Sequence, residues 1–323
     1  MSQAIRFHNT GGPEVLRLEQ VEVPPPGPGE VTVRHAAAGV NFIDIYYREG
    51  TYPTALPSGL GQEGAGTVVA IGPGVSGLRE GHRVAYVSPS LGAYAEQRNV
   101  PADLLLPLPD GIAFATAAAM MLRGLTAQYL LRRTCRVAAG DLIVVHAAAG
   151  GVGLILCQWA SALGARVVGI VGSAEKVALA RRHGCSHVLL AGDDVVARVR
   201  EIGGGEGAAV VYDAVGKDTF IQSLDCLRPL GTMVSFGNAS GLVPPVDLRE
   251  LSKRGSLFLT RPTLFTYTRK REDLLQMADE LFGMVGSGAV RIEIGQTYPL
   301  QEAARAHADL AARRTVGSTV LTL

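Results

Sequence analysis

The hydrophobic and polar positions of the chain follow two different patterns, which divide it near residue 122. Before that point, short alternating segments at 30–40, 66–72, 82–87 and 92–100 are separated by glycine and proline. Alternation with a period of two predicts half-buried strands, and the Gly/Pro stretches between them predict turns. We therefore expect a β-rich, partly barrel-like unit at the N-terminus.

From about residue 123, apolar strand-like runs alternate with helix-like segments. Residues 141–191 follow the order strand, helix, strand, helix, strand, and 208–216 and 231–237 add buried strands. Residues 219–230 are predicted to form the helix between those two strands. Near-continuous apolar strands that alternate with helices indicate a parallel, doubly wound sheet of the Rossmann type. The predicted fold class is therefore α/β, with a mostly-β second domain.

The alternation stops after residue 261. Residues 271–288 predict an amphipathic helix, and 298–323 predict a helix and a last strand, which we expect to return to the first domain. The predicted domains are 1–122 plus 262–323, and 123–261 as the dinucleotide-binding domain. The uncharged run 142–165 is long enough to span a membrane, but its centre, HAAAGGVG, breaks it into a strand and a helix.

Composition narrows the class of protein. The chain has 323 residues, 47% of them hydrophobic and 18% charged, with a formal net charge of +1. This balance predicts a globular protein and argues against a nucleic-acid partner. Its four cysteines show no CxxC spacing, and the first residues contain no apolar signal core. We expect a cytoplasmic protein with reduced cysteines and neither membrane nor nucleic-acid partners.

The sequence VVHAAAGGVG, residues 144–153, carries the most specific chemical signal. A strand ends at His146, small residues follow, and a helix runs on to Gly164. Small residues allow the backbone to approach a pyrophosphate, and the helix N-terminus presents unpaired N–H groups. A generic glycine-rich strand–helix turn is the alternative, which the position inside a βαβ unit disfavours.

The end of the second strand of this unit predicts which nucleotide binds. Val171, Gly172 and Ser173 stand where an NAD site usually has a carboxylate, and Lys176 follows. A cation without the carboxylate suits a 2′-phosphate, so the predicted cofactor is NADPH. The alternative for Lys176 is a charge pair with Glu175 at a helix start.

Two further loops follow apolar strands, at 212–216 and 235–241. Ligands of an open parallel sheet bind beyond the carboxyl ends of its strands. We therefore predict that the nicotinamide half of the cofactor lies near Val215, Gly216, Phe236 and Gly237. Asp213 and His146 are interpreted as a buried turn-forming residue and a packed histidine.

Long segments of the chain resemble the medium-chain dehydrogenase/reductase superfamily. The segments that carry the resemblance are 37–53, 56–68, 91–97, 123–131, 146–153, 210–216, 223–241 and 259–264. The chain is most similar to the zinc-independent quinone oxidoreductase branch, the NADPH:quinone reductases and their zeta-crystallin relatives. The resemblance implies a GroES-like catalytic domain, made of 1–122 plus 262–323, around the Rossmann domain.

The resemblance also bears on metal binding. Asn41 and Gln62 occupy two positions that hold zinc ligands in the zinc alcohol dehydrogenases, and residues 98–122 contain no cysteine for a second zinc. Neutral amides are poor Zn²⁺ ligands. We predict no metal site, and we expect the two amides to hydrogen-bond to each other, to the cofactor or to water. Glu63 is interpreted as a structural hydrogen-bond acceptor.

The resemblance implies specific site residues. The acceptor pocket and its catalytic groups would be Tyr46, Tyr52 and Arg261, with ordinary packing as the alternative for Tyr52 and a hinge salt bridge for Arg261. Arg313 matches an arginine near the adenosine end, and Ala191 stands where many relatives have tyrosine. The implied cofactor contacts are Asn41, Tyr46, Thr126, Ala149, Gly150, Gly151 and Val152.

The predicted function is a zinc-free, NADPH-dependent reductase that transfers hydride from nicotinamide C4 directly to a quinone. A quinone is electron-poor and needs no metal to accept hydride, so positioning is the main task of the protein. One alternative is a reductase of enone or alkenal C=C bonds. Another is a non-catalytic NADPH-binding protein with an RNA-binding or structural role. The resemblance further implies a homodimer.

Overall fold

The computed structural model describes residues 1–323 and divides into two compact units. Unit 1 comprises Met1–Leu125, Thr268–Gly286 and Ile292–Leu323, and unit 2 comprises Thr126–Tyr267 and Ser287–Arg291. The main boundaries between the units follow Leu125 and Tyr267. The sequence pattern predicts them a few residues earlier, after residues 122 and 261. The pattern gave no sign that residues 287–291 belong with unit 2.

Unit 1 is built on two β-sheets. A small sheet has the order β2-β1-β4 and a larger one the order β15-β16-β3-β5-β6-β8, with β7 paired to β3. The last strand, β16, pairs antiparallel with β3, and Thr319 of β16 faces Val40 of β3. The C-terminal tail therefore belongs to the same unit as the N-terminus. The strands of unit 1 are β1 (Ser2–Phe7), β2 (Arg17–Val21), β3 (Glu30–Val40), β4 (Ser58–Gly59), β5 (Glu63–Ile71), β6 (Arg83–Val87), β7 (Gln97–Pro101), β8 (Leu106–Pro107), β15 (Ile294–Pro299) and β16 (Ser318–Thr322).

Two helices of unit 1, α2 and α9, have 16 residues each, and the other two are short. Helix α1 begins directly after β3, and α10 lies between β15 and β16 in the chain. Helix α2 contains the residues at which the two units divide. The bounds are α1 (Phe42–Glu49), α2 (Phe114–Tyr129), α9 (Arg271–Gly286) and α10 (Ala303–Ala311), with single 3-10 turns at Pro13–Val15, Ala102–Leu104 and Leu300–Glu302.

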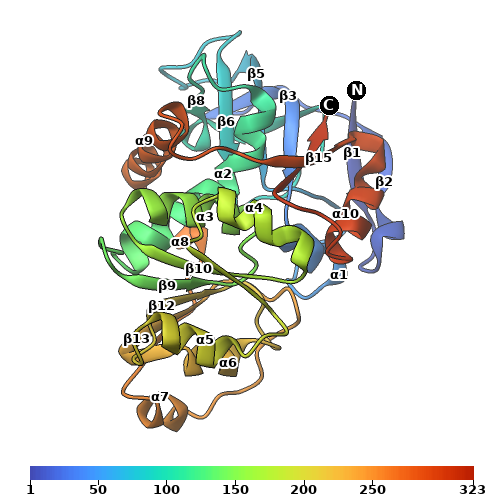
Figure 1. The fold of residues 1–323 in the computed structure, drawn as a ribbon. Helices are drawn as coiled ribbons and strands as arrows, with labels where there is room; N and C mark the ends of the chain where they lie inside the picture. The colour runs from blue at the N-terminus through green and yellow to red at the C-terminus, as the bar shows by residue number, and fades with distance from the viewer. The chain divides into compact units, whose positions relative to one another are not determined.

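Unit 2 contains a six-stranded parallel sheet of order β11-β10-β9-β12-β13-β14. Numbered within the unit, the order is 3-2-1-4-5-6, which is the doubly wound dinucleotide-binding arrangement. Helices α3 (Gly151–Ala162) and α4 (Val177–Arg182) cover one face, and α5 (Val195–Ile202) and α6 (Phe220–Asp225) cover the other (Figure 1). The predicted fold class is therefore confirmed. The strands are β9 (Leu142–Val145), β10 (Arg166–Val171), β11 (His187–Leu190), β12 (Ala208–Asp213), β13 (Leu227–Ser235) and β14 (Phe258–Thr260).

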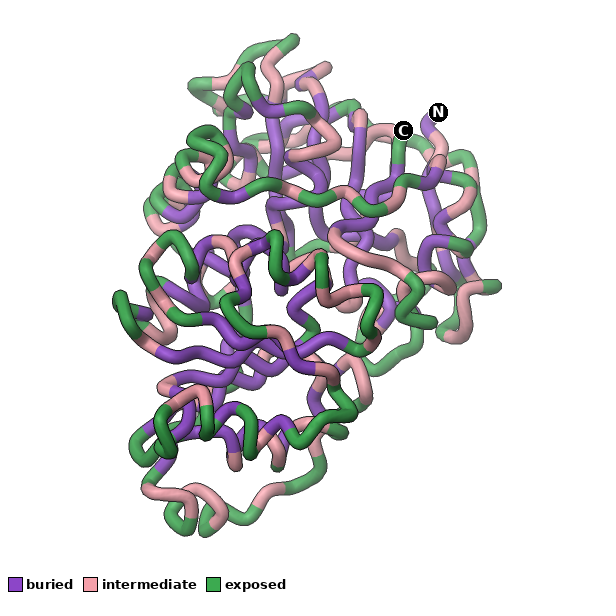
Figure 2. The backbone as a smooth tube through the Cα atoms, viewed as in Figure 1, coloured by how far each residue is buried: buried purple, intermediate pink, exposed green.

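The remaining helices of unit 2 are α7 (Arg249–Lys253), which lies between β13 and β14 in the chain, and α8 (Leu264–Tyr267), which follows β14. The unit also has one π-helical turn at Leu130–Thr134 and a 3-10 turn at Ala174–Lys176. Figure 2 shows that the strands of each unit are mostly buried and that exposed residues gather in loops and on outer helix faces. No helix combines the length and the apolar character needed to cross a membrane.

Two element predictions were wrong. The helix expected over 219–230 ends at Asp225, and β13 begins at Leu227. Pro229 lacks the N–H that a helix needs, and Leu230 has a φ of +60°, so the helix cannot continue. The strand expected over 92–100 begins only at Gln97, because Gly92, with φ +124°, starts a loop in which Ala95 forms a single bridge to Ala4.

Candidate functional site

The glycine turn of unit 2 leads from β9 into α3. Ala147 has a φ of +52°, and a Cβ built on Gly153 would lie 2.3 Å from the Ala147 carbonyl oxygen. Only glycine therefore allows α3 to pack this closely against the turn. No side chain caps the helix at Gly150, so the first backbone N–H groups of α3 are available to an anion. This arrangement fits a pyrophosphate at the positive end of the helix dipole.

The residues that follow β10 are small and leave free space around the end of the strand. Gly172 is exposed, a Cβ there would have no heavy atom within 4 Å, and Ser173 and Lys176 are half-buried. The Ala191 N–H donates to the Val171 carbonyl at 2.9 Å, which places Ala191 beside the same strand end. The position where relatives have a tyrosine therefore adjoins the predicted 2′-phosphate residues, and the contacts themselves stay predictions.

Asp213 fixes the loop that follows β12. Its Oδ1 accepts from the N–H groups of Val215 and Gly216 at 2.7 and 3.0 Å. Its Oδ2 accepts from the hydroxyls of Thr219 and Ser223 at 2.7 and 2.8 Å. Asp213 is fully buried, so its interpretation as a turn-forming residue is confirmed.

The loops after β12 and β13 lie against each other. The Ser240 N–H donates to the Val215 carbonyl at 2.8 Å, and a Cβ on Gly237 would lie 2.3 Å from the Ala214 carbonyl oxygen. The structure thus brings Val215, Gly216, Phe236 and Gly237 together at the carboxyl ends of neighbouring strands. That they border the nicotinamide stays a prediction.

His146 is a packed residue, as interpreted from the sequence. It is buried, and its Nε2 lies 2.9 Å from the Ser223 hydroxyl. Burial lowers the pKa of His146, although the nearby Asp213 opposes this shift. The imidazole is therefore neutral near pH 7.

Arg261 belongs to the same group of loops in unit 2. Its Nη1 donates to the carbonyls of Ser235 and Gly237 at 2.8 and 3.4 Å, and the residue is exposed. Within unit 2, Arg261 therefore bonds to backbone carbonyls, and the hinge salt bridge stays an untested alternative. Thr126, also in unit 2, is buried on α2.

The structure brings Tyr46 and Tyr52 together in unit 1. Their ring centroids are 5.3 Å apart in an edge-on arrangement, and the Tyr52 N–H donates to the Tyr46 carbonyl at 3.1 Å. Tyr47 contacts Tyr52 from another direction, at 5.6 Å. Arg313, also in unit 1, is exposed with a φ of +59° in the turn after α10. The roles predicted for Tyr46, Tyr52, Arg261 and Arg313 are not tested by these contacts.

Glu63 is the centre of a buried polar cluster in unit 1. Its Oε1 accepts from Asn41 Nδ2 at 2.6 Å and Arg123 Nη1 at 3.2 Å, and its Oε2 accepts from the Leu122 N–H at 2.6 Å. Burial raises the pKa of Glu63, and Arg123 opposes that shift. Glu63 is therefore a structural hydrogen-bond acceptor, as interpreted from the sequence.

The two amides at the zinc-ligand positions do not bond to each other. Asn41 binds Glu63, and Gln62 Nε2 donates to the Pro89 carbonyl at 3.2 Å. The Gln62 Oε1 atom is buried without a partner. No group of three or more His, Cys, Asp or Glu side chains is arranged to hold a metal ion. Zinc independence stays a prediction.

Sequence reasoning missed three buried polar residues of unit 1. Arg123 binds Glu63, and Tyr94 and His307 hydrogen-bond to each other. Tyr94 and His307 lie 213 positions apart in the chain, and no local pattern connects them. Arg123 had a signal, because it is a single charge within the apolar segment AAAMMLRGLTA. A buried arginine needs a buried counter-charge, and the only acid of the GLGQEGAG segment is Glu63.

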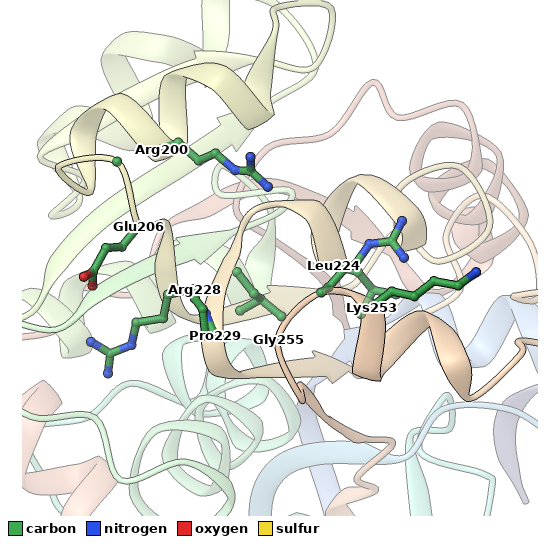
Figure 3. A pocket seen from close by; sticks show the side chains of 10 residues that line it. Arg200, Glu206, Leu224, Arg228, Pro229, Lys253 and Gly255 are labelled. Carbon is green, nitrogen blue, oxygen red and sulfur yellow. The ribbon is translucent and has the colours of Figure 1, made fainter.

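A cavity of about 670 Å³ lies elsewhere on unit 2. Ten residues line it, among them Arg200, Arg228, Lys253 and Arg254 (Figure 3). It adjoins the amino ends of β12 and β13, so it is at the opposite edge of the sheet from the glycine turn. Arg254 is already paired with Asp225 and Glu250. None of the lining residues is a predicted site residue.

Comparison with known families supports the division into two kinds of domain. The alcohol dehydrogenase GroES-like domain family matches residues 27–110, and the zinc-binding dehydrogenase family matches residues 151–282. A GroES-like domain and a Rossmann domain in one chain define a medium-chain dehydrogenase/reductase.

Individual relatives narrow this class. The chain is 54% identical to the quinone oxidoreductase of Pseudomonas aeruginosa over 99% of both chains. It is 44% identical to the 2-haloacrylate reductase of a Burkholderia species, again over 99% of both. The crystal structure of Escherichia coli quinone oxidoreductase complexed with NADPH matches with a TM-score of 0.98 and 47% identity, covering 99% of this chain and 100% of that one. The chain belongs to the quinone oxidoreductase family.

Proposed function

We propose that this chain is a zinc-free, NADPH-dependent reductase that transfers hydride to a quinone. The observation that carries the proposal is the tight glycine turn before α3, which leaves no room for a side chain at Gly153 and leaves the helix N-terminus without a side-chain cap. It occurs in a chain whose relatives include a quinone oxidoreductase complexed with NADPH. The geometry of the turn supports pyrophosphate binding, and the family relationship supports a quinone as the hydride acceptor.

The residues of unit 2 would hold most of the cofactor. The N–H groups around Gly151 and Val152 would bind the pyrophosphate, and Gly172, Ser173 and Lys176 the 2′-phosphate. When bound, NADPH supplies the hydride from C4 of its nicotinamide. The loops after β12 and β13 would border that ring. The proposed contacts from elsewhere in the chain are Asn41, Tyr46, Thr126 and Arg313.

The acceptor would meet two flat rings and one fixed cation. Tyr46 and Tyr52 offer aromatic surface for a quinone ring. Arg261 is anchored through Nη1 and keeps further N–H donors for a carbonyl oxygen that gains negative charge. The quinone takes one hydride and one proton and leaves as the hydroquinone, so the protein has to orient the acceptor and stabilise one oxyanion.

An acceptor panel tests the proposal. NADPH consumption would be followed with 1,4-benzoquinone, a naphthoquinone, an enone and a 2-haloacrylate, and we expect turnover of the quinones. The 44% identity to a 2-haloacrylate reductase favours C=C reduction as the second candidate. Turnover of the enone or haloacrylate alone would reject the quinone. Tight NADPH binding without turnover, or salt-sensitive RNA retention, would favour a non-catalytic role. One equivalent of tightly bound zinc would contradict the metal-free proposal.

The end of β10 offers a test of cofactor preference. Lys176→Glu should lower the NADPH-to-NADH preference by about tenfold or more, because a carboxylate repels the 2′-phosphate. Glu175→Gln, at the exposed neighbouring position, is the control and should change the preference little. Ala191→Tyr should tighten NADPH binding. An unchanged ratio in Lys176→Glu would show that Lys176 does not face the phosphate.

We further propose a homodimer in the cytoplasm. Strand β14 is at the edge of its sheet, and its Phe258 and Leu259 side chains are 60% and 38% exposed. An exposed apolar edge strand is suited to pairing with a second copy. All four cysteines are unpaired thiols, which supports a reducing compartment. Leu259→Lys should shift the mass measured by light scattering from dimer to monomer, and a monomeric wild type would reject the dimer.

A further inference from the structure

A chain of buried hydrogen bonds in unit 1 begins and ends on helix α1. Arg48 Nη1 lies 3.2 Å from His307 Nδ1, and His307 Nε2 lies 3.2 Å from the Tyr94 hydroxyl. The Tyr94 hydroxyl donates to Asp44 Oδ2 at 2.9 Å. All four side chains are essentially buried. The chain joins α1, α10 and the loop before β7.

The donors and acceptors allow only one direction. A guanidinium can only donate, so His307 Nδ1 accepts from Arg48 and the ring proton is on Nε2. Nε2 then donates to Tyr94, whose own proton goes to Asp44. Burial, together with a smaller effect of Arg48 in the same direction, lowers the pKa of His307 to about 3, which agrees with a neutral ring. Each donor in this chain therefore points toward Asp44.

Asp44 in turn fixes the start of α1. Its Oδ2 also accepts from the Asn41 backbone N–H at 2.7 Å, within a capping box. Its Oδ1 is buried without a partner, so Oδ2 receives both bonds. The Asn41 side chain extends from this cap to Glu63. The cap therefore sets the position of Asn41 and the first turn of the helix that carries Tyr46.

The helix depends on these polar contacts. Its eight residues are too few for independent stability. Only three of them are buried, and two of those three, Asp44 and Arg48, are ionisable, with Ile45 as the single apolar one. Gly61 leaves room for the Tyr94 side chain in this series of hydrogen bonds, because a Cβ at position 61 would lie 2.3 Å from the Tyr94 ring. Apolar packing alone therefore does little to fix the rotation of α1 about its own axis.

We propose that Tyr94 and His307 are positioning residues, which hold Asp44 and thereby keep Asn41 and Tyr46 in the orientation that hydride transfer requires. The inference rests on the proposed function, because Asn41 and Tyr46 are its proposed cofactor and acceptor residues. Small displacements of such groups reduce turnover strongly without abolishing binding.

Tyr94→Phe tests this directly, because it removes one hydroxyl and keeps the ring. We expect hydrogen exchange of the α1 amides to become about tenfold faster or more, and kcat to fall about 10- to 100-fold. The NADPH dissociation constant should change less than about threefold, since the α3 turn is untouched. The matched control is Tyr86→Phe. Tyr86 is equally buried in the same core and bonds His35 at 2.8 Å, away from α1.

His307 gives a second pair of variants if Tyr94→Phe does not fold. His307→Leu should reproduce the Tyr94→Phe effects, and His307→Gln should restore most of them, because its amide can donate to Tyr94. Normal α1 exchange and kcat in Tyr94→Phe and His307→Leu, with stability lowered only as in Tyr86→Phe, would overturn the proposal. Failure of the wild type to reduce quinones would reject the proposed acceptor instead, and the exchange of α1 would still decide the positioning role.

Discussion

The sharpest prediction concerns the buried pair of Glu63 and Arg123. Glu63→Gln keeps the size of the side chain but leaves one acceptor atom for three donors, namely Asn41 Nδ2, Arg123 Nη1 and the Leu122 N–H. The new NH₂ group would face a donor in either orientation. Arg123 would lose its counter-charge while only 6% exposed. Breaking a buried ion pair from one side costs about 3–5 kcal/mol, so we expect that loss in the free energy of unfolding of unit 1.

The assay has to report on unit 1 alone, because a chain of two units need not unfold in one step. Native-state hydrogen exchange of the β5 amides gives that local free energy. The control is Glu302→Gln in the exposed pair Arg305–Glu302 of unit 1, whose side chains are 69% and 40% exposed. It should cost no more than about 1 kcal/mol. A loss in Glu63→Gln as small as in the control would mean that Glu63 is neutral in the folded protein, and the argument would fail.

Three further predictions follow from the same structure. Gly153→Ala should destabilise unit 2 by about 1–3 kcal/mol and weaken NADPH binding at least tenfold by titration, whereas Gly192→Ala, where a Cβ meets no atom within 4 Å, should do neither. Burial raises the pKa of Asp44 from 3.8 to about 7, so its stabilising contribution is complete below pH 3.8 and lost as the pH rises through 7. Asp44→Asn should therefore gain up to about 4 kcal/mol on the wild type across that range in denaturation series, and parallel curves would refute the assignment. Burial lowers the pKa of His35 from 6.5 to about 4, so its contribution is present above pH 6.5 and lost on acidification, and His35→Gln should flatten the acid limb of the same curves.

The glycine turn between β9 and α3 could be predicted because its determinants are local. The strand, the small residues and the helix start all lie between Leu142 and Ala162, and the close approach at Gly153 is the reason a glycine stands there. The doubly wound sheet was predictable for a related reason, because buried parallel strands have apolar sequences without alternation.

The polar interior of unit 1 could not be predicted in the same way. The sequence suggested a possible pairing of Asn41 with Gln62, but Asn41 bonds to Glu63, because β3 and β5 pair in a register that opposes Ala38 and Gly64. Register and burial belong to the tertiary fold. The contact of His307 with Tyr94 likewise depends on the return of the C-terminal tail to unit 1, which brings α10 against α1.

The structure gives the residues of the GLGQEGAG segment a structural role. Gly61, with φ +87°, leaves room for the Tyr94 ring, and a Cβ on Gly66 would lie 2.0 Å from the Arg34 carbonyl oxygen. Glu63 obtains its positive counter-charge from Arg123, so the cluster is electrically balanced by the chain itself. The side-chain amide of Asn41 donates to Glu63, and the backbone N–H of Asn41 donates to Asp44 in the N-terminal cap of α1. These contacts explain why the segment keeps its glycines and its glutamate while amides occupy the two ligand positions. They also connect this segment to Tyr94, and through Asp44 to the helix that carries Tyr46.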